Sequence, residues 1–109
     1  MSKIVTATIA SGAAISSEVT TAERQRNFEV GSLILDGTYT NTSFDVQVSV
    51  DGTFYDVYDT FGNKFSVSVA TGKHSLPADV FKDSTLLRLK GSQNEAAGRT
   101  VKFLLVDMI

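Results

Sequence analysis

The chain has 109 residues, of which 42% are hydrophobic and 20% are charged, a balance typical of a folded protein rather than a disordered one. Ten basic and twelve acidic residues leave a net charge of −2, which argues against nucleic acid as a partner, because such a surface needs a clustered basic excess. The absence of cysteine excludes disulfides and thiolate metal sites. We expect a single domain, residues 1–109, that folds by packing alone.

No segment of the sequence predicts secretion or membrane insertion. Residues 1–6 lack the apolar run of a signal peptide, and the longest apolar run, residues 103–106, is far shorter than the ~20 residues of a membrane span. We therefore expect no membrane partner, and synthesis in the cytoplasm of the cell that produces the protein.

Residues 3–9 form the first predicted strand, because Val5, Ala7 and Ile9 alternate with threonines. A period of two places these three apolar side chains on one buried face. A second, short strand is expected over residues 15–20.

The next segment combines a polar stretch with a buried strand. Thr20 and Glu23 have the spacing of a capping box, but no apolar stripe follows them, so we expect a polar turn with at most one helical loop. Residues 28–35 carry aliphatic side chains on both faces near their end, which predicts a strand covered on both sides.

The middle of the chain, residues 44–69, predicts two consecutive β-hairpins, because its apolar and polar residues alternate with a period of two. The three strands span residues 44–50, 53–58 and 65–69. Asp51-Gly52 supplies the first tight turn, and residues 59–63 supply the second. The side chains expected to face the core are Phe44, Val46, Val48, Val50, Phe65, Val67 and Val69, together with Phe103 and Leu105.

Residues 86–90 and 99–106 predict the last two strands. Pro77 favours one short helical turn over residues 78–81, since proline suits a first helical turn. The polar, glycine-rimmed loop 91–98 is expected to be mobile or used in contacts. About eight short strands predict an all-β fold, an antiparallel β-sandwich that is jelly-roll-like or Ig-like with at most one short helical turn.

The sequence shows no catalytic set, and we expect no enzyme, no cofactor and no metal. The only histidine, His74, lies between strands, where a polar surface residue is ordinary. Asp51, Asp56 and Asp59 could hold calcium, but the closing glutamate of a calcium loop is missing, and aspartates at turns usually bond to the backbone. Two of Asp45, Asp56 and Asp59 could supply the paired carboxylates of a glycoside hydrolase. Any β protein offers such pairs, so this pattern does not indicate an enzyme.

Four aromatic residues could stack on sugars, which keeps a carbohydrate- or receptor-binding module as an alternative. They are Tyr39, Tyr55, Tyr58 and Phe61. The absence of tryptophan counts against this alternative.

Phe61 lies at the tip of a predicted hairpin, where a polar residue would normally face water. Such a tip indicates burial against a neighbouring subunit or loop, and the alternative is that the turn covers its own ring. The two chain ends carry further apolar groups that a sandwich need not cover. The candidate subunit or capsid contacts are therefore Val5, Phe61, Met108 and Ile109.

Several stretches, taken in order, resemble a group of small β-sandwich proteins encoded among the virion genes of tailed bacteriophages. They are residues 9–13, residues 49–59 with Phe61-Gly62-Asn63, residues 76–81, and residues 86–92 with residues 94–100. The resemblance spans nearly the whole chain and rests on turn chemistry and core pattern. The chain departs from it at the polar residues 22–27, where the relatives are richer in glycine.

The resemblance implies a virion structural protein, in the first place a head decoration or cement protein located on the capsid surface. Its implied partners are the major capsid protein and further copies of the chain itself, arranged as a homotrimer. The alternative within the virion is a tail fibre, baseplate or neck component. In each case the protein would be made in the host bacterial cytoplasm.

Overall fold

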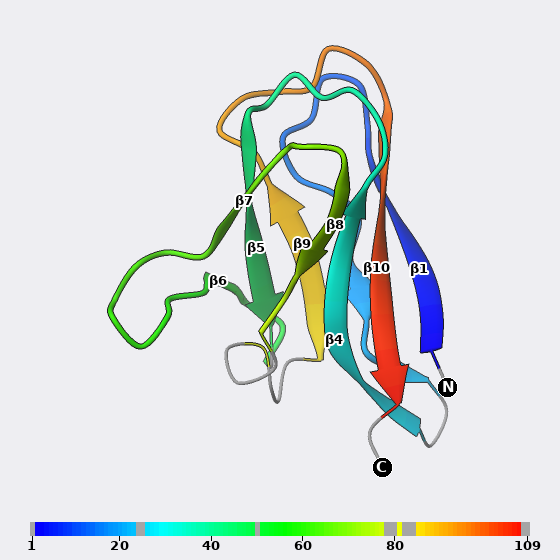
Figure 1. Cartoon of the computed structure of the whole chain (residues 1–109). Helices are drawn as coiled ribbons and strands as arrows, with labels where there is room; N and C mark the ends of the chain where they lie inside the picture. Colours follow the sequence, from blue (N-terminus) through cyan, green and yellow to red (C-terminus); the bar gives the residue numbers. More distant parts are fainter. Residues whose placement is uncertain (1, 24–25, 50, 78–80, 82–84, 108–109) are drawn as a thin grey trace.

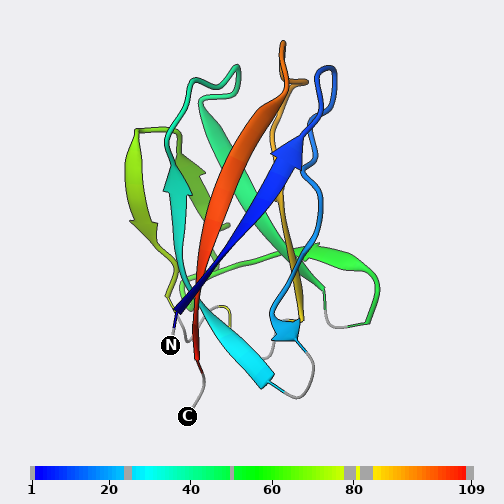
Figure 2. The same ribbon diagram turned by 90° about the vertical axis from the view of Figure 1, so that its right-hand side faces the viewer.

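Two antiparallel sheets stacked on each other form the protein in the computed structural model (Figure 1 and Figure 2). The structure describes residues 2–23, 26–49, 51–77, 81 and 85–107. Its strands are β1 (Ser2–Ile9), β2 (Val19–Thr20), β3 (Ala22–Glu23), β4 (Arg26–Leu35), β5 (Ser43–Ser49), β6 (Phe54–Asp56), β7 (Ser66–Ser68), β8 (Gly72–Ser75), β9 (Leu86–Lys90) and β10 (Arg99–Asp107). The predicted all-β antiparallel sandwich is confirmed.

β10 lies inside the first sheet, between β1 and β4, and β4 also pairs with β3 and β8. Phe103 and Leu105 of β10 are fully buried against the second sheet. The pairing with β4 shifts between Leu104 and Leu105 and skips Gly31. A Cβ atom on Gly31 would lie 2.9 Å from Val106 Cγ2, so glycine allows the two strands to approach at this bulge.

β5 lies inside the second sheet, with β9 on one side and both β6 and β7 on the other. The first predicted hairpin is confirmed, because Val48 pairs with Tyr55 across a turn in which Gly52 has a φ of +93°. The second hairpin is confirmed at its turn and base, where Tyr58 bridges Lys64 and the N–H of Phe65 donates to Val57 O, but its return strand does not continue along β6. β7 pairs with residues 43–45 of β5, beside β6 on residues 47–49, so both short strands use one edge of β5.

The buried core matches most of the predicted inward side chains. Fully or almost fully buried are Phe44, Val46, Val67, Phe103 and Leu105. Half-buried and packed against them are Val48, Phe65 and Val69, while Val50 lies outside the described residues. The alternation of the sequence therefore gives the correct register for β5, β7 and β10.

Residues 19–20 and 22–23 form two short strands where a polar turn with a helical loop was predicted, and residues 24–25 of that predicted turn lie outside the described residues. Val19–Thr20 pairs with β9 in one sheet, and Ala22–Glu23 pairs with β4 in the other. Between them Thr21 is buried, and its N–H donates to Thr85 O at 3.0 Å. Pairing of β2 with the distant β9 and of β3 with the start of β4 thus overrides the local capping-box signal.

The predicted helical turn after Pro77 is described only at Phe81, which is buried and donates from its N–H to Pro77 O at 3.2 Å. Residues 78–80 lie outside the described residues. Within the part of the chain that the structure describes, no helix is long and apolar enough to cross a membrane.

Candidate functional site

Residues 57–65 project from the edge of the second sheet, and we call this segment the arm (Figure 1). The chain leaves the sheet after Asp56, which pairs with Gln47, and returns at Ser66, which pairs with Asp45. Because β5 fixes both ends of the arm two residues apart, the intervening residues extend away from the sandwich.

Backbone contacts close the base of the arm. The N–H of Phe65 donates to Val57 O at 2.7 Å, and Tyr58 and Lys64 form an antiparallel bridge. Val57 is buried and belongs to the hydrophobic core, so it anchors the base. The arm is therefore a short ordered ribbon rather than an open loop.

Asp59 organises the tip of the arm. Its Oδ1 accepts hydrogen bonds from the N–H groups of Phe61 (2.9 Å) and Asn63 (3.0 Å). Its backbone N–H donates to Asn63 O at 2.9 Å, and its carbonyl accepts from Gly62 N at 3.0 Å. Gly62 has a φ of +82°, a conformation that glycine adopts readily. The turn predicted at Asp59 is confirmed.

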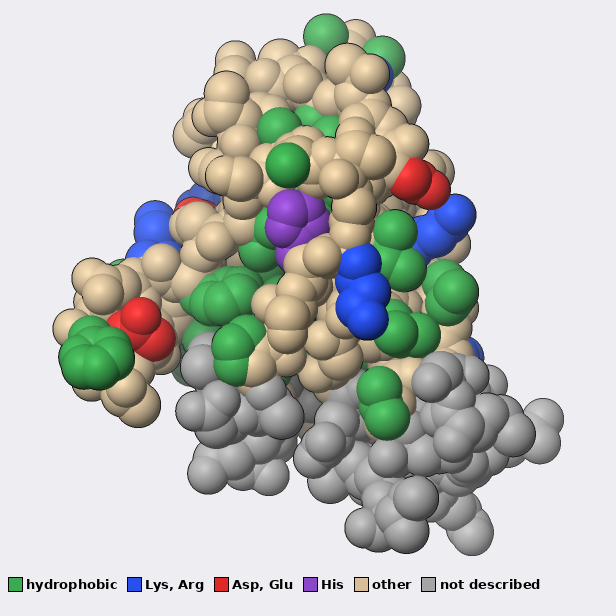
Figure 3. Space-filling model, viewed as in Figure 1, with side chains coloured by type: hydrophobic (Ala, Val, Ile, Leu, Met, Phe, Trp, Pro, Cys, Tyr) green, Lys and Arg blue, Asp and Glu red, His purple; other side chains and the backbone are tan. Residues whose placement is uncertain are grey.

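The ring of Phe61 is 88% exposed at this ordered tip. Figure 3 shows an apolar side chain beside an acidic one at the far end of the projecting segment. The alternative that the turn covers its own ring is therefore wrong. An exposed aromatic ring on a preorganised loop can bind a partner without a large loss of conformational entropy.

Asp45 holds the base of the arm on the outer face of β5. Its Oδ2 lies 3.2 Å from Lys64 Nζ, and its Oδ1 accepts a hydrogen bond from Ser66 Oγ at 2.6 Å. The hydrogen bond to Asp45 raises the pKa of Lys64. Because both charges are accessible to water, these contacts orient the arm more than they stabilise the fold.

Gln47 is only 6% exposed, although its place between Val46 and Val48 directs its side chain away from the core between the sheets. Its Nε2 donates to Asp56 Oδ1 at 2.9 Å, and its Oε1 accepts from Arg88 Nε at 2.9 Å. The Arg88 guanidinium in turn lies 4.1 Å from the centre of the Phe54 ring. This chain of contacts across β9, β5 and β6 covers the outer face of the sheet beside the arm.

Three loops meet at one end of the sandwich, the upper end in Figure 1. They comprise residues 10–14, 36–42 and 91–98, and we call them the crown loops. Within them, Glu95 is 1% exposed. Its backbone N–H donates to Ala13 O at 2.9 Å, which ties the first crown loop to the last.

The Glu95 carboxylate ties the last crown loop to the middle one. Its Oε1 accepts from Thr40 N (2.7 Å) and Arg99 Nε (3.0 Å), and its Oε2 accepts from Asn41 N (3.0 Å) and Asn41 Nδ2. Burial alone would raise the pKa of Glu95. The hydrogen bonds from Thr40, Asn41 and Arg99 together outweigh this effect and lower the pKa from 4.5 to about 2. The carboxylate is a structural anion, and the sequence pattern gave no sign of it.

An open hollow of about 300 Å³ lies beside the crown loops. It is lined by Asp36, Gly37, Thr38, Tyr39, Gly98, Arg99 and Thr100. Its larger polar side chains already have partners, since Tyr39 Oη donates to Thr100 O at 3.1 Å, Lys102 Nζ lies 3.1 Å from Asp36 Oδ2, and Arg99 Nε donates to Glu95 Oε1 at 3.0 Å. The hollow therefore leaves few free polar side chains with which to bind a ligand.

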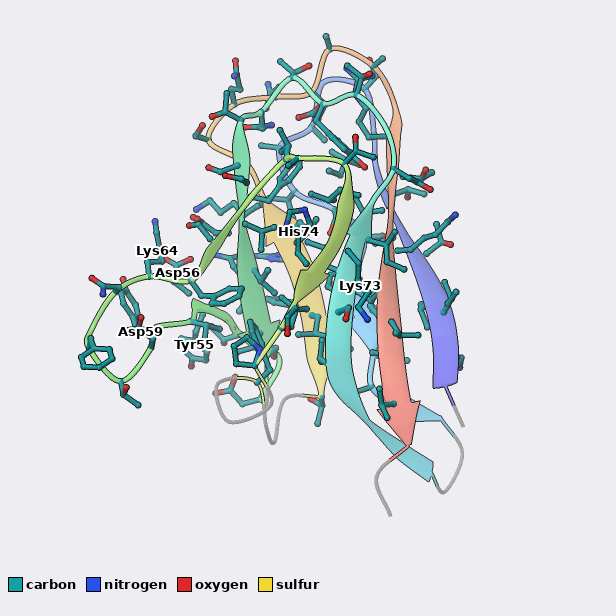
Figure 4. All side chains as sticks on the ribbon, viewed as in Figure 1. Tyr55, Asp56, Asp59, Lys64, Lys73 and His74 are labelled. Carbon is teal, nitrogen blue, oxygen red and sulfur yellow. The ribbon has the colours of Figure 1, made fainter. Side chains whose placement is uncertain are left out.

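The residues considered for catalysis or metal binding do not converge. His74 lies on β8 with its Nε2 2.7 Å from Ala70 O, and Figure 4 shows it well apart from Asp56 and Asp59. Asp51 accepts from Thr53 N at 3.0 Å as part of its turn. Among the described residues, no group of three His, Cys, Asp or Glu side chains could hold a metal ion.

The tyrosines do not form one sugar-binding row. Tyr39 packs edge-on against Phe44, with ring centres 5.6 Å apart, beside the crown loops. Tyr55 and Tyr58 are exposed on β6 and the arm instead. A continuous aromatic platform across all three is therefore absent.

The chain ends differ from the predicted contact set. Val5 is half-buried and packs against the core, whereas its neighbour Ile4 is 58% exposed on the outer face of β1. Met108 and Ile109 lie outside the described residues. Phe61 is thus the predicted contact residue that the structure places in an exposed, ordered position.

The fold has a counterpart among solved structures. The crystal structure of the SPBc2 prophage-derived protein YomS matches with a TM-score of 0.57 and 11% sequence identity, covering 96% of this chain and 94% of that chain. At this identity the likeness establishes a shared sandwich fold. No protein-family model and no curated protein matches the chain.

Proposed function

We propose that this chain is a bacteriophage virion structural protein that decorates the capsid by binding the outer surface of the head through its arm. The observation that carries the proposal is the 88% exposed Phe61 on a tip ordered by Asp59. The fold it shares with a prophage-derived protein, over almost the full length of both chains, supports a phage origin. The homotrimer implied by the sequence resemblance remains part of this proposal.

The arm would act as a wedge between subunits of the major capsid protein. Burial of an exposed phenylalanine ring contributes about 1.5–3 kcal/mol. Because the hydrogen bonds of Asp59 already order the tip, little of this energy is offset by ordering the loop on binding. A pocket formed only where coat subunits meet would make binding specific for the assembled shell.

The role assigned to the protein is stabilisation rather than a reaction. A molecule that binds only the assembled shell stabilises it by mass action, by about 2.7 kcal/mol per site at a hundredfold excess over the Kd. Repeated over many equivalent sites, this effect would raise the resistance of the shell to heat and to the pressure of packaged DNA.

Phe61→Ser tests the role of the arm. We expect the variant to keep the circular dichroism and melting temperature of the parent, because Phe61 is 88% exposed and adds little to the packing of the fold. Its affinity for assembled shells should fall roughly 10- to 100-fold. Cosedimentation with shells measures the change.

Ile15→Ser is the matched control, since Ile15 is also exposed, at 41%, but lies outside the arm. It should bind shells as the parent protein does. Equal shell binding by Phe61→Ser and the parent would contradict the contact assigned to the arm. Copurification with tails instead of heads would show that the protein is a tail component rather than a head decoration.

A further inference from the structure

β1 forms an open edge of the first sheet. It pairs with β10 along its whole length, from Ser2 with Val106 to Ile9 with Arg99, and no register shift interrupts the ladder. In the strand order it is terminal, and Figure 1 shows no strand beyond it. An eight-residue edge strand of this kind carries a row of backbone groups that face away from the sheet.

The contacts of Thr8 show which backbone groups face outward. The N–H of Thr8 donates to Ser17 Oγ at 3.0 Å, and its carbonyl accepts from Ser17 N at 2.8 Å, both on the side away from β10. Alternate residues of an antiparallel strand point their backbone groups to the same side. The N–H and C=O groups of Ser2, Ile4 and Thr6 therefore face outward as well.

Ser17 covers only the Thr8 end of this edge. Among the described residues, none contributes a hydrogen bond to the outward groups of Ile4 and Thr6. Of the usual protections of an edge strand, β1 has one charged residue, Lys3, but no proline and no bulge, and Ile4 adds a 58% exposed aliphatic side chain. Natural proteins rarely leave such an edge unpaired.

We propose that β1 is a self-association site, at which two copies of the chain pair their β1 strands antiparallel about a two-fold axis and join their first sheets into one. The occupant is a second copy because the edge is complementary to itself. The proposal does not depend on a virion role. If the chain also forms trimers, this contact joins two of them.

The residue pattern selects the register in which Ile4 pairs with Ile4 of the second copy. In this register Ser2 faces Thr6, so all outward groups of these residues are used in about six hydrogen bonds. The Ile4 side chains meet at the axis, and Lys3 lies beside Val5 rather than beside another lysine. A register shifted by two residues would place Ser2 against Thr8, whose groups are already bonded to Ser17.

Strand pairing over a short edge buries less than the ~1,200 Å² of a standard protein interface, so we expect association in the micromolar to millimolar range. Two variants test it by different routes. Thr6→Pro removes an outward N–H and leaves the ladder with β10 intact, because the N–H of Thr6 does not point toward β10. Ile4→Lys places two positive charges together at the axis.

Thr6→Val and Ile15→Lys are the matched controls, since the first keeps the N–H at the edge and the second adds the same charge elsewhere on the surface. Sedimentation over a concentration series up to about 1 mM measures the mass of each protein. At the highest concentration, we expect the parent protein and both controls to reach the same mass. Thr6→Pro and Ile4→Lys should reach half of that mass. Circular dichroism shows whether each variant folds. If Thr6→Pro does not fold, the mass of Ile4→Lys alone tests the proposal.

A direct readout accompanies the mass measurement. Amide hydrogen exchange of Ile4 and Thr6 should slow as the concentration of the parent protein rises, whereas exchange of other exposed amides should not change. A parent protein with the same mass as Ile4→Lys at all concentrations would overturn the proposal. So would exchange at Ile4 and Thr6 that does not depend on concentration.

Discussion

Glu95 shows how one buried charge can order a whole loop region. Its carboxylate accepts from Thr40, Asn41 and Arg99, and its backbone bonds to the loop that contains Ala13. A carboxylate buried at 1% exposure is tolerated because donors surround it. The crown loops are thus held by a specific polar network rather than by apolar packing.

Glu95→Gln should destabilise the protein by about 2–3 kcal/mol. The amide group of glutamine would turn donor hydrogens toward the N–H and Nδ2 of Asn41, which are donors themselves, and it would leave Arg99 without its counter-ion. Urea denaturation measures the loss. A variant as stable as the parent would contradict the structural role of this carboxylate.

The same residue predicts an acid limit to stability. The pKa of Glu95 falls from an ordinary value of 4.5 to about 2 on folding, so the unfolded chain binds the proton first as the pH drops. Its contribution is therefore fully present above about pH 4.5 and is lost as the pH falls toward 2. Melting temperatures of the parent protein should decline over this window more steeply than those of Glu95→Gln, and parallel curves would contradict the assignment.

At the scale of elements, the arm results from competition for one edge of β5. The sequence predicted the turns at Gly52 and Asp59 correctly, because turn residues act locally. It could not predict that β7 would pair with β5 instead of β6, since strand pairing depends on contacts distant in sequence. The nine residues between the two strands are therefore displaced from the sheet and form the arm.

Sequence reasoning also missed Gln47 and Glu95 as buried residues. Gln47 alternates with Val46 and Val48, and Glu95 lies between Asn94 and Ala96, so hydrophobic periodicity places neither residue in the core. Their burial depends on partners from other strands and loops, Arg88 for Gln47 and Thr40 for Glu95. Such partners can be identified only once the fold brings them together.

Asp59→Ala tests whether the arm is preordered. The change removes the acceptor shared by the N–H groups of Phe61 and Asn63, at a local cost of about 1 kcal/mol. We expect faster amide exchange at these two residues with an unchanged global melting temperature, and weaker shell binding although the ring of Phe61 is still present. Unchanged exchange at the tip would show that Asp59 does not order it.

At the scale of the whole molecule, the sandwich presents different surfaces in different directions. The core between the sheets is closed by residues such as Phe44 and Phe103, and the polar network of Glu95 fixes the crown loops. The arm projects from one sheet, and the edge of β1 borders the other. A framework with two exposed features on separate sheets fits the proposed role of connecting subunits.

The most direct test of the central claim compares binding to assembled shells and to unassembled coat subunits of the phage or prophage proposed to encode the chain. Purified protein is added to shells that lack it, and cosedimentation and shell melting are measured together. We expect saturable binding to shells, no binding to free coat subunits, and a higher melting temperature of the decorated shells. Shells that bind none of the protein, or that melt at the same temperature when saturated with it, would contradict a stabilising role on the head.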